Sequence, residues 1–174
     1  VNINPAYRVH ELEYVLNQAG IRLLVAAPSF KTSDYAAMVA EVRDQCGELE
    51  DVVLLGTDRW SDMAQHEIDT LALHAQAATL QFDDPINIQY TSGTTGFPKG
   101  ATLSHHNILN NGFFVGDLLG YTDADRVCVP VPFYHCFGMV MGNLGATANG
   151  ATIVIPAPAF DPSATLRAVQ DERC

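Results

Sequence analysis

The chain has 174 residues, of which 48% are hydrophobic and 17% charged, and these values suit one globular domain and exclude a disordered chain. Nine basic side chains stand against 20 acidic ones, so the formal charge of -11 disfavours binding to nucleic acid or to an anionic membrane. Prolines and polar residues interrupt the most apolar region, 127–160, so it lacks the ~20 apolar residues of a membrane-spanning helix.

Helical and strand patterns alternate along the chain. Helices are expected at 10–19, 35–46, 68–78, 107–119 and 137–148, and a last helix is expected after Asp161, with Pro162 at its first position. Strands are expected at 21–27, 52–56, 86–90, 127–131 and 151–155, and the first two read as strands buried on both faces. This alternation predicts an α/β fold with a mainly parallel sheet flanked by helices.

The cysteines and the two ends of the chain bear on where it works. Cys46, Cys128, Cys136 and Cys174 form no CxxC pair, which favours free thiols in a reducing compartment, and we expect the cytoplasm. The first residues do not show the pattern of a secretory signal peptide, in which charged residues are followed by an apolar stretch. Because the chain opens on an extended-looking VNIN and stops inside a helical pattern, we expect it to be a piece of a longer protein.

Residues 90–100 read YTSGTTGFPKG and lie between an expected strand and an expected helix, where ligands of α/β proteins collect. Glycine turns, hydroxyl groups and the charge of Lys99 together suit the oxygens of a polyphosphate. The segment is not a Walker loop, because that motif needs glycine directly before lysine and here Pro98 holds that position. The alternative interpretation is a flexible surface loop.

YTSGTTGFPKG resembles the signature loop of the adenylate-forming, or AMP-binding, enzymes, a superfamily that includes acyl-CoA synthetases, luciferases and peptide-synthetase adenylation domains. PFYHCFG at 132–138 is similar to their second substrate motif, and the segments VNINPAYRVHELEYVLNQAG, TLSHHNILNN and ANGATIVIPAPAFDPSATLRAVQ are typical in order and spacing. The likeness covers almost the whole chain and is greatest to the fatty-acyl-CoA synthetase branch. It implies that residues 1–174 form part of the large N-terminal domain, with the C-terminal domain absent.

The resemblance implies a reaction in two steps. A carboxylate attacks the α-phosphate of ATP to give an acyl-adenylate and pyrophosphate, and coenzyme A then takes the acyl group. Donors fixed around the β- and γ-phosphates, together with magnesium, would stabilise the departing pyrophosphate. The positions that match the family's phosphate-binding residues are Thr91, Ser92, Gly93, Thr94, Thr95, Gly96 and Lys99.

The second motif supplies the candidate acyl site. The resemblance implies that His135 orients the acyl carboxylate at the α-phosphate, so Lys99 and His135 are the candidate catalytic residues. By itself, a histidine among apolar residues is more often structural. Phe133 and Tyr134 are either core aromatics or the lining of an acyl pocket. Gly138 begins a run of small residues that either packs a helix or leaves a channel for an alkyl chain.

Two other features are interpreted as structural. His105 and His106 could join His135 in a zinc site, but no cysteine or carboxylate stands at ligand spacing, so no metal site is predicted. FDPS at 160–163 resembles the aspartate motif of peptide-synthetase domains, yet Asp161 stands where a helix begins. A plain carboxylic acid is therefore favoured over an amino acid as substrate.

Full-length relatives continue through a glutamate stretch that contacts adenine and magnesium, an aspartate that holds the ribose, and a small terminal domain with a lysine for adenylation. None of these is found before the chain ends at Cys174, so the chain alone is expected to be inactive. Uncovered strand edges and apolar surface would favour self-association, as a homodimer. Two alternatives stay open: another adenylating enzyme (aryl-CoA ligase, luciferase-like or carrier-protein-loading), or a non-catalytic ATP-binding module.

Overall fold

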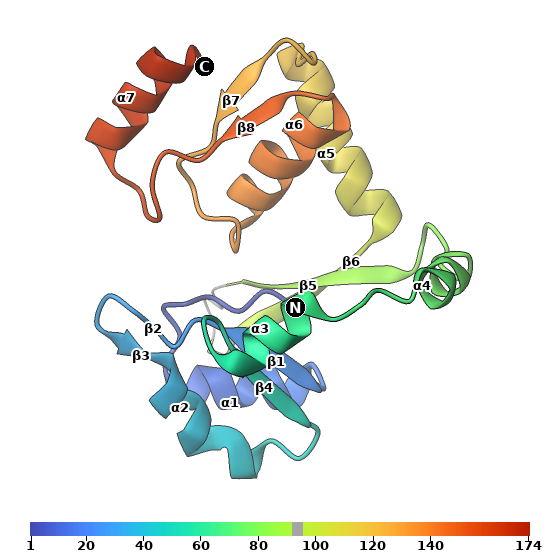
Figure 1. The fold of residues 1–174 in the computed structure, drawn as a ribbon, viewed down its shortest axis with the longest axis vertical. Coiled ribbons are helices and arrows are strands. Elements are labelled where there is room, and N and C mark those ends of the chain that lie inside the picture. Colours follow the sequence, from blue (N-terminus) through green and yellow to red (C-terminus); the bar gives the residue numbers. More distant parts are fainter. Residues whose placement is uncertain (92–95) are drawn as a thin grey trace. The chain divides into compact units, whose positions relative to one another are not determined.

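The computed structural model describes residues 1–91 and 96–174 and divides into two compact units (Figure 1). The first unit contains Val1, Ile3–Leu80 and Tyr90–Ala101. The second contains Asn2, Gln81–Gln89 and Thr102–Cys174. Strands β5 (Pro85–Thr91) and β6 (Lys99–Ser104) pair with each other. Each of these two strands has residues in both units.

The first unit begins with a helix and a parallel pair of strands. Its elements are α1 (Val9–Gln18), β1 (Leu23–Ala26), β2 (Ser29–Phe30), β3 (Ser33–Asp34), α2 (Tyr35–Val42), a 3-10 turn (Arg43–Gln45), β4 (Asp51–Leu54), α3 (Asp58–Gln65) and α4 (Thr70–Ala77). Strands β1 and β4 are parallel, with Leu24 opposite Val52, and β2 and β3 form a small antiparallel pair. The parallel pair is the arrangement that the alternating pattern predicts.

The core of this unit lies where α1 and α2 pack together over one face of β1. It is a cluster of apolar side chains: Leu12, Leu16, Leu24, Val39, Val42, Cys46 and Leu49. The expectation that β1 is buried on both faces is wrong, because Leu23 is 49% exposed and Val25 42% exposed. Side chains alternate between the two faces of a strand, so α1 and α2 cover the face of Leu24, whereas Leu23 and Val25 point to the other face of β1 and stay partly exposed.

The second unit contains a second parallel pair of strands and the longest helix. Its remaining elements are α5 (His105–Leu119), β7 (Arg126–Cys128), a π-helical segment (Phe137–Leu144), α6 (Gly145–Ala148), β8 (Thr152–Val154) and α7 (Pro162–Glu172). Strands β7 and β8 pair in parallel, with Val127 opposite Ile153. Of the helices in residues 1–91 and 96–174, none combines the length and the apolar character needed to cross a membrane.

Capping groups place the helices of the second unit. The Asp161 side chain accepts a hydrogen bond from the Ala164 N–H, as the sequence predicts for this helix start. The Ser104 hydroxyl accepts one from the Asn107 backbone N–H, so α5 begins two residues before the expected start. At the other end of α5, Gly120 has φ +70°, the left-handed conformation that commonly ends a helix. Gly112 allows α5 to approach its neighbour closely, because a Cβ there would stand 2.6 Å from the Leu144 Cβ.

Candidate active site

The predicted phosphate-binding segment begins at the end of β5 and ends at the start of β6. Thr91 is the last residue of β5 and Lys99 is the first residue of β6, and the Thr91 hydroxyl donates to the Lys99 carbonyl at 3.4 Å. The Lys99 side chain is exposed and so is available to a ligand. Of the other predicted phosphate ligands, Gly96 is described, while Ser92, Gly93, Thr94 and Thr95 lie outside the described residues.

Strand β6 corrects the sequence-based view of this segment. We expected residues 90–100 to lie between a strand and a helix that begins near Asn107, but Lys99–Ser104 form a strand that pairs with β5. Lys99 therefore stands on a strand. The turn before it needs glycine at position 96, because Gly96 has φ +128°, a backbone conformation that residues with a Cβ rarely adopt.

Side chains of α1 contact two residues of this segment, Tyr90 and Phe97. Tyr90 is only 7% exposed, and its hydroxyl donates to the Gln18 Oε1 at 2.8 Å. Phe97 stacks on the Tyr14 ring with a centroid distance of 4.7 Å and an interplanar angle of 26°. Burial, with smaller contributions from Tyr14 and Tyr7, raises the pKa of the Tyr90 hydroxyl, so Tyr90 remains a phenol that donates this hydrogen bond.

His135 lies in the second unit, at the start of the π-helical segment. The Phe137 backbone N–H donates to the His135 Nδ1 at 3.1 Å, and the Met139 N–H donates to the His135 carbonyl at 3.0 Å. A ring nitrogen that accepts a hydrogen bond carries no proton, so a neutral His135 holds its proton on Nε2. The side chain is exposed. Neutral His135 thus accepts from the Phe137 N–H with one nitrogen and presents an N–H donor with the other.

Gly138 has a structural role that the sequence left undecided. A Cβ at this position would stand 2.3 Å from the Pro132 carbonyl oxygen and 2.8 Å from the Val131 carbonyl oxygen. Glycine is therefore required so that the helix can pack directly on the chain that precedes His135. Gly142 does the same one turn later, where a Cβ would stand 2.6 Å from the Val129 Cγ1. These small residues serve close packing of the second motif.

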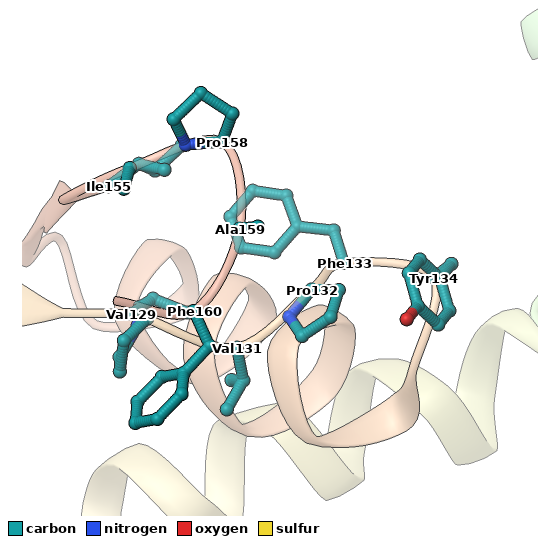
Figure 2. Close-up of a pocket in the computed structure, with 11 residues that line it drawn as sticks. Val129, Val131, Pro132, Phe133, Tyr134, Ile155, Pro158, Ala159 and Phe160 are labelled. Carbon is teal, nitrogen blue, oxygen red and sulfur yellow. The ribbon is translucent and has the colours of Figure 1, made fainter. Parts of the chain in front are cut away.

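Phe133 and Tyr134 line an apolar hollow of about 380 Å³ beyond the carboxyl ends of β7 and β8 (Figure 2). One wall is the segment after β7, formed by Val129, Pro130, Val131, Pro132, Phe133 and Tyr134. The other wall is the segment after β8, formed by Ile155, Ala157, Pro158, Ala159 and Phe160. Parallel strands commonly bind ligands at this edge. His135 follows directly in the sequence, so a polar donor adjoins residues that line an apolar hollow.

Two residues that the sequence analysis did not select hold the second motif in place. The Gln89 Nε2 donates to the Tyr134 carbonyl at 2.7 Å, and its Oε1 accepts from the Asn2 amide at 3.4 Å. The same Asn2 amide lies 3.2 Å from the Met139 sulfur. Gln89 directly precedes the YTSGTTGFPKG segment, and that adjacency is the one signal in the sequence that could have pointed to it.

The described residues contain no cluster of side chains that forms a metal-binding site. Across residues 1–91 and 96–174, no group of three or more His, Cys, Asp or Glu side chains could hold a metal ion. His106 instead packs edge-on against Phe82, at 5.7 Å between ring centroids, and its backbone N–H donates to the Phe82 carbonyl. The candidate catalytic residues fall in separate units, Lys99 in the first and His135 in the second.

The AMP-binding enzyme family matches the chain over residues 1–174. All of the chain aligns with the mitochondrial medium-chain acyl-CoA ligase ACSF2 of Danio rerio, at 38% identity and over 32% of that protein. All of it also aligns with the putative acyl-CoA synthetase YngI of Bacillus subtilis, at 36% identity and over 35% of that protein. The chain thus spans about a third of the length of these curated relatives.

Solved structures show the same fold. ATP-bound MatB from Rhodopseudomonas palustris superimposes with a TM-score of 0.69 at 31% identity, over 97% of this chain and 32% of that one. The inhibitor-bound N-terminal domain of FACL13 from Mycobacterium tuberculosis gives a TM-score of 0.76 at 24% identity, over 98% of this chain and 40% of that one. The fold is therefore the α/β fold of an adenylate-forming N-terminal domain. The chain belongs to the AMP-binding enzyme family.

Proposed function

We propose that the protein carrying this chain is an AMP-forming acid–thiol ligase, which activates a fatty acid with ATP and transfers the acyl group to coenzyme A. Family membership and the acyl-CoA ligases among its relatives support an enzyme of this class. One observation carries the choice of substrate. The exposed His135, with its Nε2–H donor, directly follows residues that line an apolar hollow, which suits an acid with a polar head and an apolar body.

Each group has a proposed task in the first step. The attacking carboxylate oxygen forms a bond to the α-phosphorus while the bond to the pyrophosphate oxygen breaks. His135 donates to the carboxylate and fixes its direction, and the Lys99 ammonium offsets the negative charge that develops on the pyrophosphate. Thr91, Ser92, Gly93, Thr94, Thr95 and Gly96 are proposed to donate to the β- and γ-phosphates. Phe133 and Tyr134 are proposed to contact the acyl chain.

Magnesium has a limited place in this proposal. Mg²⁺ prefers oxygen ligands and is usually bound through one or two carboxylates together with substrate phosphates. The described residues supply a threonine hydroxyl at Thr91 but no cluster of carboxylates. When bound with ATP, the ion would supply further charge neutralisation at the phosphates.

We also propose that the 174 residues carry one part of a larger site. The chain spans about a third of the relatives that it matches, and the ribose and adenine contacts expected for the family were not found in its sequence. Alone, the 174 residues would then form no thioester. Apolar side chains such as Leu71, 83% exposed, and Leu118, 87% exposed, support self-association of this piece.

We propose that the full-length protein is located in the cytoplasm.

The test of this function is ATP–pyrophosphate exchange by the full-length protein with a panel of acids. We expect exchange with octanoate or palmitate that far exceeds exchange with benzoate or with an amino acid, since the hollow is apolar. Faster exchange with benzoate would show that the substrate is an aryl acid and would contradict the proposed fatty acid. Binding of ATP without exchange in the presence of any acid would contradict a ligase and favour the non-catalytic module.

A further inference from the structure

Helix α1 presents a row of side chains to the phosphate-binding segment. His10, Tyr14 and Gln18 are spaced by four residues, which places them on one face of the helix. The buried residues of α1 are Leu12, Val15 and Leu16, on its core side. His10 and Tyr14 both contact the Phe97 ring, at centroid distances of 5.3 Å and 4.7 Å. The helix thus serves two purposes, one in the core and one at the segment.

Gln18 links the two ends of the segment through a continuous set of contacts. Its Oε1 accepts from the Tyr90 hydroxyl at 2.8 Å, and its Nε2 donates to the Tyr14 hydroxyl oxygen at 2.7 Å. Tyr14 in turn stacks on Phe97. Both polar atoms of one amide are therefore engaged, each by a side chain that leads to a different end of the segment.

The residues that are held in this way adjoin the described phosphate donors. Tyr90 directly precedes Thr91, and Phe97 is two residues before Lys99. We propose that Gln18 is a positioning residue, which holds Tyr90 and, through Tyr14, Phe97, and so sets the separation of Thr91 and Lys99. Its effect on catalysis rests on the proposed function, because it acts through groups that bind the phosphates of ATP. A site that is held before ATP arrives needs less ordering during the reaction.

The first readout is cleavage of the full-length protein by a lysine-specific protease, followed at Lys99 and at Lys31, and it does not depend on enzyme activity. The 174 residues contain lysine only at positions 31 and 99. Native-state cleavage follows the population of locally opened molecules. Loss of the contact to Tyr90 in Gln18→Leu or Tyr90→Phe should therefore speed cleavage after Lys99 roughly three- to tenfold. Cleavage after Lys31, on the exposed turn between β2 and β3, should not change.

Matched variants separate positioning from general stability. Gln18→Glu keeps two oxygens that can accept from Tyr90 and Tyr14, so it should restore slow cleavage. Gln170→Leu, an exposed glutamine of α7, should behave as wild type. If Gln18 and Tyr90 act through the same hydrogen bond, the double variant Gln18→Leu/Tyr90→Phe should be cleaved after Lys99 no faster than the faster of the two single variants. Equal cleavage after Lys99 in all variants would overturn the proposal.

The second readout is ATP–pyrophosphate exchange in the full-length protein. Gln18→Leu and Tyr90→Phe should lower kcat/KM for ATP roughly tenfold and leave KM for the acid unchanged. Faster cleavage with unchanged exchange would show that Gln18 is structural only and would overturn the positioning role. If wild type shows no exchange while the variants are cleaved faster, the proposed function fails and the link between Gln18 and the segment stands.

Discussion

Replacing Lys99 by alanine is expected to slow acyl-adenylate formation on the order of a hundredfold. Loss of one preorganised charge contact to a reacting group costs about 3 kcal/mol. Lys99 is the one cation in YTSGTTGFPKG, and its side chain is exposed at the start of β6. Binding of the fatty acid should change little, because the proposed role of Lys99 concerns the pyrophosphate. The measurement is the rate of ATP–pyrophosphate exchange beside the dissociation constant of the acid.

Lys31→Ala is the matched control for this variant. Lys31 is the other lysine of the chain, and it lies in the same unit on an exposed turn, with its ammonium 5.5 Å from the Phe30 ring centroid. Its loss removes the same charge and the same side chain away from the proposed phosphate site. Exchange should therefore remain at the wild-type rate in Lys31→Ala. A wild-type rate of ATP–pyrophosphate exchange in Lys99→Ala as well would show that Lys99 has no role in acyl-adenylate formation.

Replacing His135 is expected to affect the first half-reaction far more than the second. His135→Ala should slow adenylation of the free acid roughly a hundredfold, because a carboxylate that is no longer oriented rarely meets the α-phosphate in line. Thioester formation from preformed acyl-adenylate should be nearly unaffected, since it requires no free carboxylate. The two rates are measured separately, by pyrophosphate exchange and by thiol consumption with acyl-adenylate supplied.

His135→Asn distinguishes the proposed donor role of Nε2 from the hydrogen bond that Nδ1 accepts from the Phe137 N–H. The asparagine side-chain oxygen occupies a place similar to Nδ1 and can still accept from the Phe137 N–H, but no donor remains at the place of Nε2. Adenylation should fall in both variants, while only His135→Ala should lose the stability that the hydrogen bond from the Phe137 N–H contributes. Equal losses in both half-reactions for either variant would make His135 a structural residue.

Local signals were sufficient to predict most helices of this chain. The helix starts after Ser104 and Asp161 follow from side chains that accept hydrogen bonds from the first turn, and both bonds are present. Helix α1 was predicted from its row of apolar residues, and it begins and ends within one residue of the expected bounds. Where a short stretch of sequence contains its own start signal and a buried face, the fold can be predicted locally.

Elements that depend on distant partners were not predicted. Strand β6 reads KGATLS, which has neither β-branched runs nor alternation, and it becomes a strand by pairing with β5. Helix α3, eight residues long and without a buried residue, was also not predicted, although Thr57 caps it by accepting from the Trp60 N–H. Strand β6 thus depends on a partner strand, whereas the start signal of α3 at Thr57 is local.

Some residues of the candidate site were predicted from the sequence, and others were found only in the structure. Lys99 and His135 were predicted because they lie within motifs that resemble known ones. Gln18 was not, because its partner Tyr90 is 72 residues away, and Gln89 was not, because its partner Tyr134 is 45 residues away. The resemblance thus pointed to the groups proposed to touch substrate, whereas the groups that hold them emerged only from the three-dimensional contacts.

The central claim is that a carboxylate oxygen attacks the α-phosphate of ATP, and isotope transfer tests it most directly. The full-length protein is supplied with ATP, coenzyme A and a fatty acid that carries oxygen-18 in its carboxylate. The attacking oxygen remains on phosphorus when the thiol takes the acyl carbon, so each thioester formed should leave one labelled oxygen in AMP. Unlabelled AMP, or label found in inorganic phosphate beside ADP, would contradict adenylation.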